Sequence, residues 1–323
     1  MPRCSIFKNG VTIGPTGAVR PCCAFEVKQG TQNLFWTDDW QTRHAEWGKR
    51  SETEWLDECA ECKLSEELTG DSLRTTYNKQ FENEVGIKHW DLKINNTCNF
   101  ACRMCNMTSS STWANIVRDN QDKNWSKQYD NKPNTRWAKQ AVEFSHLMLD
   151  AKIVKFTGGE PFMIPQVKKI IQRLIDEDVA SAIELHLITN GSYDMTAWNH
   201  LFEKFRRVEI NISIEAVGER YEYIRPGSSW LTTSENAVIF NKQKPKNTHM
   251  TVTILPMVFN RNNLDEIIDW CDSNKINYFQ STPVIKPAFM SPDAMQDGIL
   301  RKILIEQSEI MDEIHGTNYQ DFI

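Results

Sequence analysis

The chain has 323 residues, of which 40% are hydrophobic and 25% are charged, as in ordinary globular proteins. Its formal net charge is −6, so it lacks the overall positive field that draws proteins to nucleic acid. The sequence contains no run of about 18 apolar residues and no apolar N-terminal stretch, which argues against a membrane span and an export signal. We therefore expect a cytoplasmic protein.

From residue 87 onward, short segments rich in β-branched and aromatic residues alternate with longer segments of helical period. The strand candidates are 89–95, 152–158, 183–190, 208–215, 249–258 and 276–284. Helices are expected over 162–178, 195–206, 232–243 and 262–274. In the first of these, one face carries Val167, Ile170, Ile171, Leu174 and Ile175. Six strand–helix repeats predict a parallel sheet that binds ligands at the C-terminal ends of its strands, as an open, partial (βα)6 barrel.

Two further segments surround this core. The connection over residues 106–150 is polar and long for an α/β protein, and it either faces the substrate or covers the barrel. Residues 137–149 within it look helical. Residues 292–323 read as one long amphipathic helix with a packing role. We expect an N-terminal domain over 1–86, a core over 87–290 and a C-terminal extension over 291–323.

Polar motifs follow four of the predicted strands. A cysteine triplet follows the first, and TGGEP (157–161), TNGS (189–192) and SIE (213–215) end the next three. Each alone has a structural explanation, because Gly-Gly and Asn-Gly are common turn dipeptides and serine often caps helices. Their placement at one edge of a parallel sheet indicates a site.

The triplet consists of Cys98, Cys102 and Cys105, within TCNFACRMCNM (97–107). An odd number of cysteines cannot all be paired in disulfides, and a closed structural zinc site takes four protein ligands. In a reducing compartment, grouped cysteines more often serve metal or redox chemistry than disulfides. Three thiols suit a cluster with one metal corner left open.

This spacing, with GGE at the end of the second strand, resembles the radical S-adenosylmethionine (SAM) superfamily over about residues 87–290. The resemblance implies that the three thiolates hold a 4Fe-4S cluster whose fourth iron is chelated by SAM. It further implies that an electron entering the cluster cleaves SAM, and that the resulting 5′-deoxyadenosyl radical abstracts hydrogen from a substrate. The protein then positions the reactants and excludes water and oxygen.

The same resemblance assigns SAM contacts. Gly158, Gly159 and Glu160 would present a backbone oxygen and a carboxylate to the SAM ammonium. The ribose and carboxylate of SAM would meet Asn190, Ser213 and Arg225, the alternative for Arg225 being a surface ion pair. Family members usually carry an aromatic residue just before the third cysteine, beside adenine, and here that residue is Met104, whose thioether can also pack on a ring.

A second group of cysteines lies in the first 86 residues. Cys4, Cys22, Cys59 and Cys62, with turn signals KNG and PTG flanking VTI, resemble the twitch domain, a shortened SPASM domain that carries an auxiliary cluster. The first cysteines are expected on a short antiparallel pair. The resemblance implies a second 4Fe-4S cluster that transfers electrons or supports the fold, with a Cys4 zinc site as the alternative. In the family this domain usually follows the barrel, whereas here it precedes it.

Two cysteines remain. Cys23 is an alternative ligand to Cys22, and Cys271 is expected to be a buried, small apolar residue.

The resulting hypothesis is a radical SAM enzyme, in the oxidoreductase class, that acts on a peptide or protein side chain. The alternatives are the same chemistry on a sugar or nucleoside, or a non-catalytic iron-sulfur or zinc electron carrier. The GGE segment and Arg225 argue against a carrier, which has no need of a SAM site. An external electron donor such as flavodoxin or ferredoxin is expected, without membrane or nucleic-acid partners.

Overall fold

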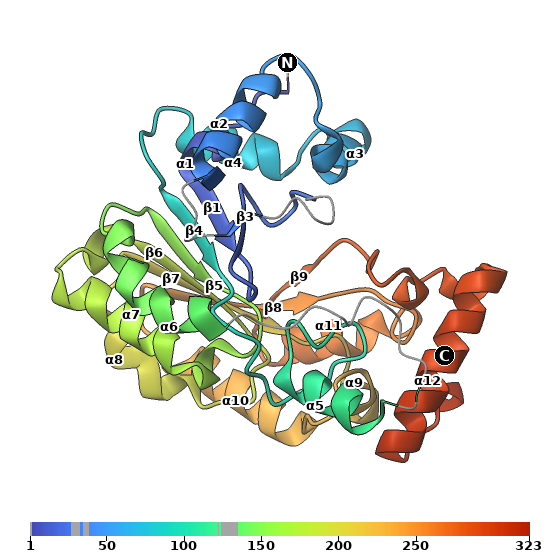
Figure 1. Cartoon of the computed structure of the whole chain (residues 1–323). Coiled ribbons are helices and arrows are strands. Elements are labelled where there is room, and N and C mark those ends of the chain that lie inside the picture. The colour runs from blue at the N-terminus through green and yellow to red at the C-terminus, as the bar shows by residue number, and fades with distance from the viewer. Residues whose placement is uncertain (1, 27–32, 35–38, 122, 124–134) are drawn as a thin grey trace.

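The structure is a computed structural model that describes residues 2–26, 33–34, 39–121, 123 and 135–323. Within these residues, nine strands form one sheet in the order β3-β2-β1-β4-β5-β6-β7-β8-β9 (Figure 1). The strands are β1 Gly10–Ile13, β2 Ala18–Arg20, β3 Asn33–Leu34, β4 His89–Leu92, β5 Ile153–Phe156, β6 Glu184–Thr189, β7 Arg207–Ser213, β8 Thr248–Ile254 and β9 Asn277–Gln280.

The six strands expected from the sequence are confirmed. From β4 to β9, strands adjacent in the sheet are also consecutive in the chain, and every pair is parallel. The connections between these strands contain helices, because parallel neighbours must be joined by a long crossover. They are α5 Ser111–Asp119, α6 Thr135–Phe144, α7 Pro165–Asp176, α8 Asn199–Phe202, α9 Gly218–Ile224, α10 Trp230–Gln243 and α11 Leu264–Ser273. The result is a mostly parallel α/β sheet.

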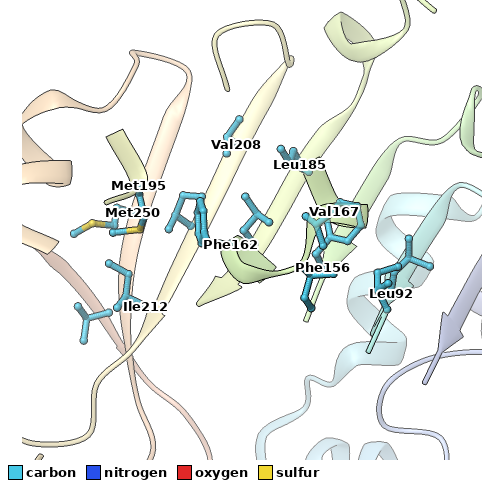
Figure 2. Packing of buried hydrophobic residues seen from close by; sticks show 14 of the residues in the cluster. Leu92, Phe156, Phe162, Val167, Leu185, Met195, Val208, Ile212 and Met250 are labelled. Atoms are coloured by element: carbon cyan, nitrogen blue, oxygen red, sulfur yellow. The ribbon is translucent and has the colours of Figure 1, made fainter. Parts of the chain in front are cut away.

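One face of the sheet is apolar because alternate strand residues point to it. Figure 2 shows Leu92, Phe156 and Leu185 of the strands beside Phe162 and Val167, which come from the segment that begins α7. All except Phe162 are 1% exposed or less. The predicted helical face is confirmed, since three more α7 residues are fully buried: Ile170, Ile171 and Leu174. This core fixes which strand residues point to the opposite face.

The N-terminal segment joins the same sheet. β1 pairs antiparallel with β2, which confirms the expected hairpin, and it pairs in parallel with β4. Its helices are α1 Ile6–Asn9, α2 Asp39–Arg50, α3 Ala60–Thr69 and α4 Leu73–Phe81. Residues of α1 and α4 form a small core with Ile153 of β5, and Trp47 of α2 packs against it. Figure 1 shows α1, α2 and α4 on the side of the sheet opposite α7, α8 and α10. The domain boundaries at residues 86 and 290 stay predictions.

Two expectations for the N-terminal hairpin were wrong. KNG (8–10) is not a turn, because α1 runs to Asn9 and β1 begins at Gly10. The PTG turn is confirmed, with Gly17 at φ 81° and its N–H donating to the Gly14 carbonyl at 2.8 Å. Consequently Cys4 precedes α1 and Cys22 follows β2, so they flank the antiparallel pair instead of lying on it.

The other corrections concern helix lengths. The segment 195–206 forms a 3₁₀ turn over Met195–Trp198 followed by the short α8. The C-terminal segment is not one helix over 292–323, because α12 spans Gly298–His315 and ends at Gly316 in the left-handed conformation, with φ 68°. Helix is confirmed within 137–149, as α6 and a 3₁₀ turn, while much of the rest of the 106–150 connection lies outside the described residues. No helix among the described residues is both long and apolar enough to span a bilayer.

Candidate functional site

The cysteine triplet lies in the loop between β4 and α5, and the first turn of α5 holds that loop. The hydroxyls of Ser111 and Thr112 donate to the Cys98 carbonyl at 3.0 and 2.8 Å. The indole N–H of Trp113 donates to the Cys102 carbonyl at 2.8 Å. Backbone bonds from Ala101 and Arg103 to residues 226 and 224 attach the loop to the end of α9. The loop is therefore fixed from two directions.

The three thiols of the loop interact with one another. Burial raises the pKa of Cys98, of Cys102 and of Cys105, the last to about 11. Repulsion from Cys98 raises the pKa of the other two thiols further. Because metal ligation requires thiolates, a bound cationic cluster would relieve both effects, so this donor set fits an iron-sulfur cluster. Within the described part of the chain, no group of three or more His, Cys, Asp or Glu side chains is gathered closely enough to hold a single metal ion.

Arg225 lies beside this loop, at the end of α9. Its guanidinium pairs through two nitrogens with the carboxylate of Glu215, and its Nη1 donates to Cys102 Sγ at 3.3 Å. Both partners of the ion pair are buried. The pair places a cation against the sulfur of Cys102, and Glu215 neutralises much of that cation's charge.

The GGE segment meets the same loop from β5. Gly158 and Gly159 have φ angles of 71° and 62°, and a side chain on Gly159 would reach within 2.5 Å of the Thr97 carbonyl. The Glu160 N–H donates to that carbonyl at 2.7 Å. Glycine is thus required here for a left-handed backbone in close contact with the loop.

The Glu160 carboxylate is fully buried and connects the ends of β5 and β6. It accepts hydrogen bonds from Phe162 N at 3.2 Å, Thr189 Oγ1 at 2.8 Å and Asn190 N at 2.7 Å. Burial raises the pKa of Glu160 to about 7, while these three donors act in the opposite direction. Its carboxylate therefore ties the loops after β5 and β6 to each other.

The remaining predicted SAM contacts differ in what they touch. Asn190 Nδ2 contacts Cys98 Sγ at 3.9 Å and donates to Asn99 Oδ1 at 2.9 Å. Ser213 ends β7, paired in register with Thr253, and is partly buried. Met104 is partly buried against the main core. Of the three, Asn190 is the one that directly contacts a cluster-loop thiol.

Four of the N-terminal cysteines lie together. Cys4, Cys22, Cys59 and Cys62 all line one cavity of about 20 Å³, together with Arg74 and Tyr77 of α4 and other side chains. Burial raises the pKa of all four thiols, those of Cys4 and Cys59 to about 12, and Cys62 raises those of the other three further. Four thiols around one cavity fit a metal centre in their donor chemistry.

Cys23 and Cys271 lie elsewhere. Cys23 does not line the cavity of the four thiols, so the geometry favours Cys22 as the ligand of that site. Cys271 is fully buried in the main core, as expected.

Sequence reasoning missed the partners of two arginines near the triplet, Arg225 and Arg103. Glu215 was visible as the last letter of SIE, but its pairing with Arg225 was not predicted. Arg103, inside the loop, donates to Asp312 Oδ1 of α12 at 2.7 Å, and its guanidinium lies 3.7 Å from the ring centroid of Tyr223. No sequence signal links residues 209 positions apart.

Comparison with known proteins places these features in a family. The family model of the Radical SAM superfamily matches residues 92–273, more than half of the chain. No curated protein matches.

Two solved structures are similar at low identity. One is native anSMEcpe with bound AdoMet, with 13% identity over 59% of this chain and 51% of that chain and a TM-score of 0.45. The other is Streptococcus suis SuiB bound to S-adenosylmethionine, with 13% identity over 82% of this chain and 57% of that chain and a TM-score of 0.45. In both cases the chain spans less than two thirds of the neighbour's own length.

Proposed function

Since the family match covers more than half of it, the chain belongs to the radical SAM superfamily, and we propose that it generates a radical from SAM to abstract hydrogen from a peptide or protein side chain. Membership implies an enzyme that uses SAM and a 4Fe-4S cluster. The observation that supports radical generation from SAM is the convergence of Cys98, Cys102 and Cys105 with the GGE segment at the ends of parallel strands.

In this proposal, six sequential parallel strands, β4 to β9, build a partial (βα)6 barrel. The cluster, when bound, supplies the electron that cleaves SAM to methionine and a 5′-deoxyadenosyl radical. The residues of the chain hold and shield the reactants. The three thiolates of the triplet bind iron and leave one corner for SAM, and Glu160 faces the SAM ammonium with Gly158 and Gly159 shaping the approach.

The other assigned contacts keep their proposed roles with one addition. Asn190 and Ser213 contact the ribose and carboxylate of SAM, and Met104 packs beside adenine. Arg225 is proposed to reach the SAM carboxylate, but its pairing with Glu215 and its bond to Cys102 also support a role in stabilising the thiolate. A flavodoxin or ferredoxin would deliver the electron.

We assign a second 4Fe-4S cluster to Cys4, Cys22, Cys59 and Cys62, as in a twitch domain. The shared cavity supports a metal centre, and the presence of an iron-sulfur site elsewhere in the chain favours iron. Zinc is the second candidate, because four cysteine thiolates are also a ligand set of structural zinc sites.

Anaerobic reconstitution tests the proposal. Reduced protein should convert SAM to 5′-deoxyadenosine, and the variant with alanine at all three triplet cysteines should not. Wild-type rates in that variant would refute the assignment. Deuterium transfer into 5′-deoxyadenosine from labelled peptides, as opposed to labelled sugars or nucleosides, would then separate a peptide substrate from a small molecule.

A further inference from the structure

A row of polar side chains crosses the face of the sheet that the main helices leave free. The register pairs Thr12 of β1 with Arg20 of β2 and with Asp91 of β4, and it pairs Asp91 with Lys155 of β5. Paired residues point to the same face, and Lys93 follows Asp91 by two positions, so it points there as well. The N-terminal helices lie on this side (Figure 1).

The charges in this row do not balance. Lys155 Nζ lies 3.3 Å from Asp91 Oδ2, and the Thr157 hydroxyl donates to the other carboxylate oxygen at 3.1 Å. Among the residues that the structure describes, neither Lys93 nor Arg20 has an ion-pair partner. Three cations and one carboxylate leave a net charge of +2.

The excess charge is partly buried. Burial lowers the pKa of Lys93, and repulsion from Arg20 lowers it further. Attraction to Asp91 acts in the opposite direction, but Lys155 shares that carboxylate, so one carboxylate faces three cations. An anionic ligand would relieve the remaining repulsion.

Thr12 provides an independent indication of a ligand. Its side chain is fully buried, and its hydroxyl has no hydrogen-bond partner in the described structure. A buried hydroxyl without a partner costs about 1–3 kcal/mol, and a bound acceptor would remove that cost. The hydroxyl lies in the same row, between Arg20 and Asp91, where it could donate to a bound anion.

The row adjoins the proposed SAM site. A side chain on Gly158 would come within 3.0 Å of the Lys93 side chain, so Lys93 lies against the GGE segment. Lys93 is also among the cations that oppose the upward effect of burial on the Cys105 pKa. At the other end, Arg20 precedes Cys22 by two residues. The row therefore extends from the triplet toward the N-terminal cysteines.

We propose that Arg20, Lys93 and Thr12 bind an anionic group of the substrate, a carboxylate or a phosphate. This inference rests on the proposed function and names a substrate class for it. The carboxylate of SAM is the other source of an anion near Lys93. The row spans four neighbouring strands of the sheet, β5, β4, β1 and β2, and so extends away from the proposed SAM site. This extent favours a second molecule, with its own negative charge, as the ligand.

Inorganic phosphate is a direct probe. Its binding to reconstituted, unreduced, full-length protein should be measured by calorimetry in chloride buffer, with and without saturating SAM. We expect one saturable site that SAM does not displace. Lys93→Gln and Arg20→Gln should each weaken it about ten-fold or more, as loss of a charge-assisted hydrogen bond implies. Lys246→Gln, at an exposed lysine, is the matched control and should bind phosphate like the wild type.

Thr12→Val keeps the test decisive if a charge variant folds poorly. The hydroxyl has no partner among the described residues, so this variant should retain wild-type iron content and thermal stability while binding phosphate less tightly. Competition between phosphate and SAM would assign the cations to the SAM carboxylate and overturn the proposal. Absence of a saturable site, or equal binding by all variants, would overturn it too. Wild-type 5′-deoxyadenosine formation, measured separately, shows whether the proposed function itself has failed.

Discussion

Arg225 and Glu215 form a buried ion pair that lies against the thiol of Cys102. The guanidinium donates to Glu215 Oε2 at 2.5 Å from Nε and to Cys102 Sγ at 3.3 Å from Nη1. The sequence suggested a SAM contact or a surface pair for Arg225, and the structure shows a buried pair beside the cluster loop. Its first consequence is for stability.

Glu215→Gln should destabilise the protein strongly. It leaves the Arg225 charge buried without its counter-ion, and breaking one side of a buried pair costs about 3–5 kcal/mol. The midpoint of urea unfolding measures the loss. Arg206→Gln removes a cation from a more exposed pair with Glu184 and should cost under about 1 kcal/mol. Equal shifts of the unfolding midpoint in the two variants would show that burial of the Arg225 pair does not add to the free energy of unfolding.

Glu160→Gln should weaken SAM binding and also loosen the loops. The carboxylate accepts from three donors, whereas glutamine has one acceptor oxygen and an amide that must face one of those donors. We expect a stability loss of about 1–3 kcal/mol and, if the charge meets the SAM ammonium, an affinity loss of about ten-fold or more.

Equilibrium dialysis of SAM and iron analysis separate these two effects of Glu160. Iron content should stay at the wild-type level, because the carboxylate bonds to loop backbone and a hydroxyl and not to a thiol. The exposed Glu203→Gln is the control. Unchanged SAM affinity in the Glu160 variant would leave this residue a purely structural role.

Asp312→Ala should impair the cluster loop from a distance. Asp312 on α12 accepts from Arg103, which lies between Cys102 and Cys105, and the same guanidinium stacks on Tyr223. Without the carboxylate, a buried cation inside the loop loses its partner, which costs about 3–5 kcal/mol. Reconstituted iron per chain should fall, and the cluster should be lost faster in air.

The control for Asp312 is Glu309→Gln, at an exposed residue of the same helix. Full iron loading with unchanged air sensitivity in the Asp312 variant would mean that α12 only packs against the core, as its sequence suggested.

The sheet could be predicted from the sequence because its signals are local. Alternating burial in β6 and β7 and the apolar stripe of α7 follow directly from residue order. The helix over 195–206 was predicted too long. The helix ends at Phe202 because the chain must turn before β7 begins at Arg207, and the periodic pattern does not show this turn.

The site could be predicted only as far as its motifs are contiguous. The triplet and GGE are short strings, so they were found. The partners of Arg103 and Arg225 depend on which distant side chains the fold brings beside them, and Asp312 lies in a segment with no motif. The row from Arg20 to Lys155 likewise exists only once strand register is known, because two of its members, Thr12 and Lys155, are 143 residues apart in the chain.

The N-terminal cysteines allow a sharp test of cluster against zinc. If Cys4, Cys22, Cys59 and Cys62 hold a 4Fe-4S cluster, reconstituted protein should contain about eight irons per chain, and the variant lacking the triplet cysteines should retain about four. That variant should be brown, with broad thiolate-to-iron absorption. If zinc fills the site, the variant should be colourless, with about one zinc and almost no iron.

The neighbouring cysteines provide the matched control for this last prediction. Cys22 lines the cavity with the other three thiols and Cys23 does not, so in the triplet-deficient background Cys22→Ser should abolish the remaining metal while Cys23→Ser should leave it in place. The reverse result would make Cys23 the ligand, and retention of metal in both would show that the four thiols do not form one site.

Electron transfer adds a separate expectation in the otherwise wild-type chain. Replacing Cys59 and Cys62 by alanine should spare SAM cleavage and suppress product whenever the substrate radical must give up an electron, whereas survival of both rates in a folded protein would make the second site structural.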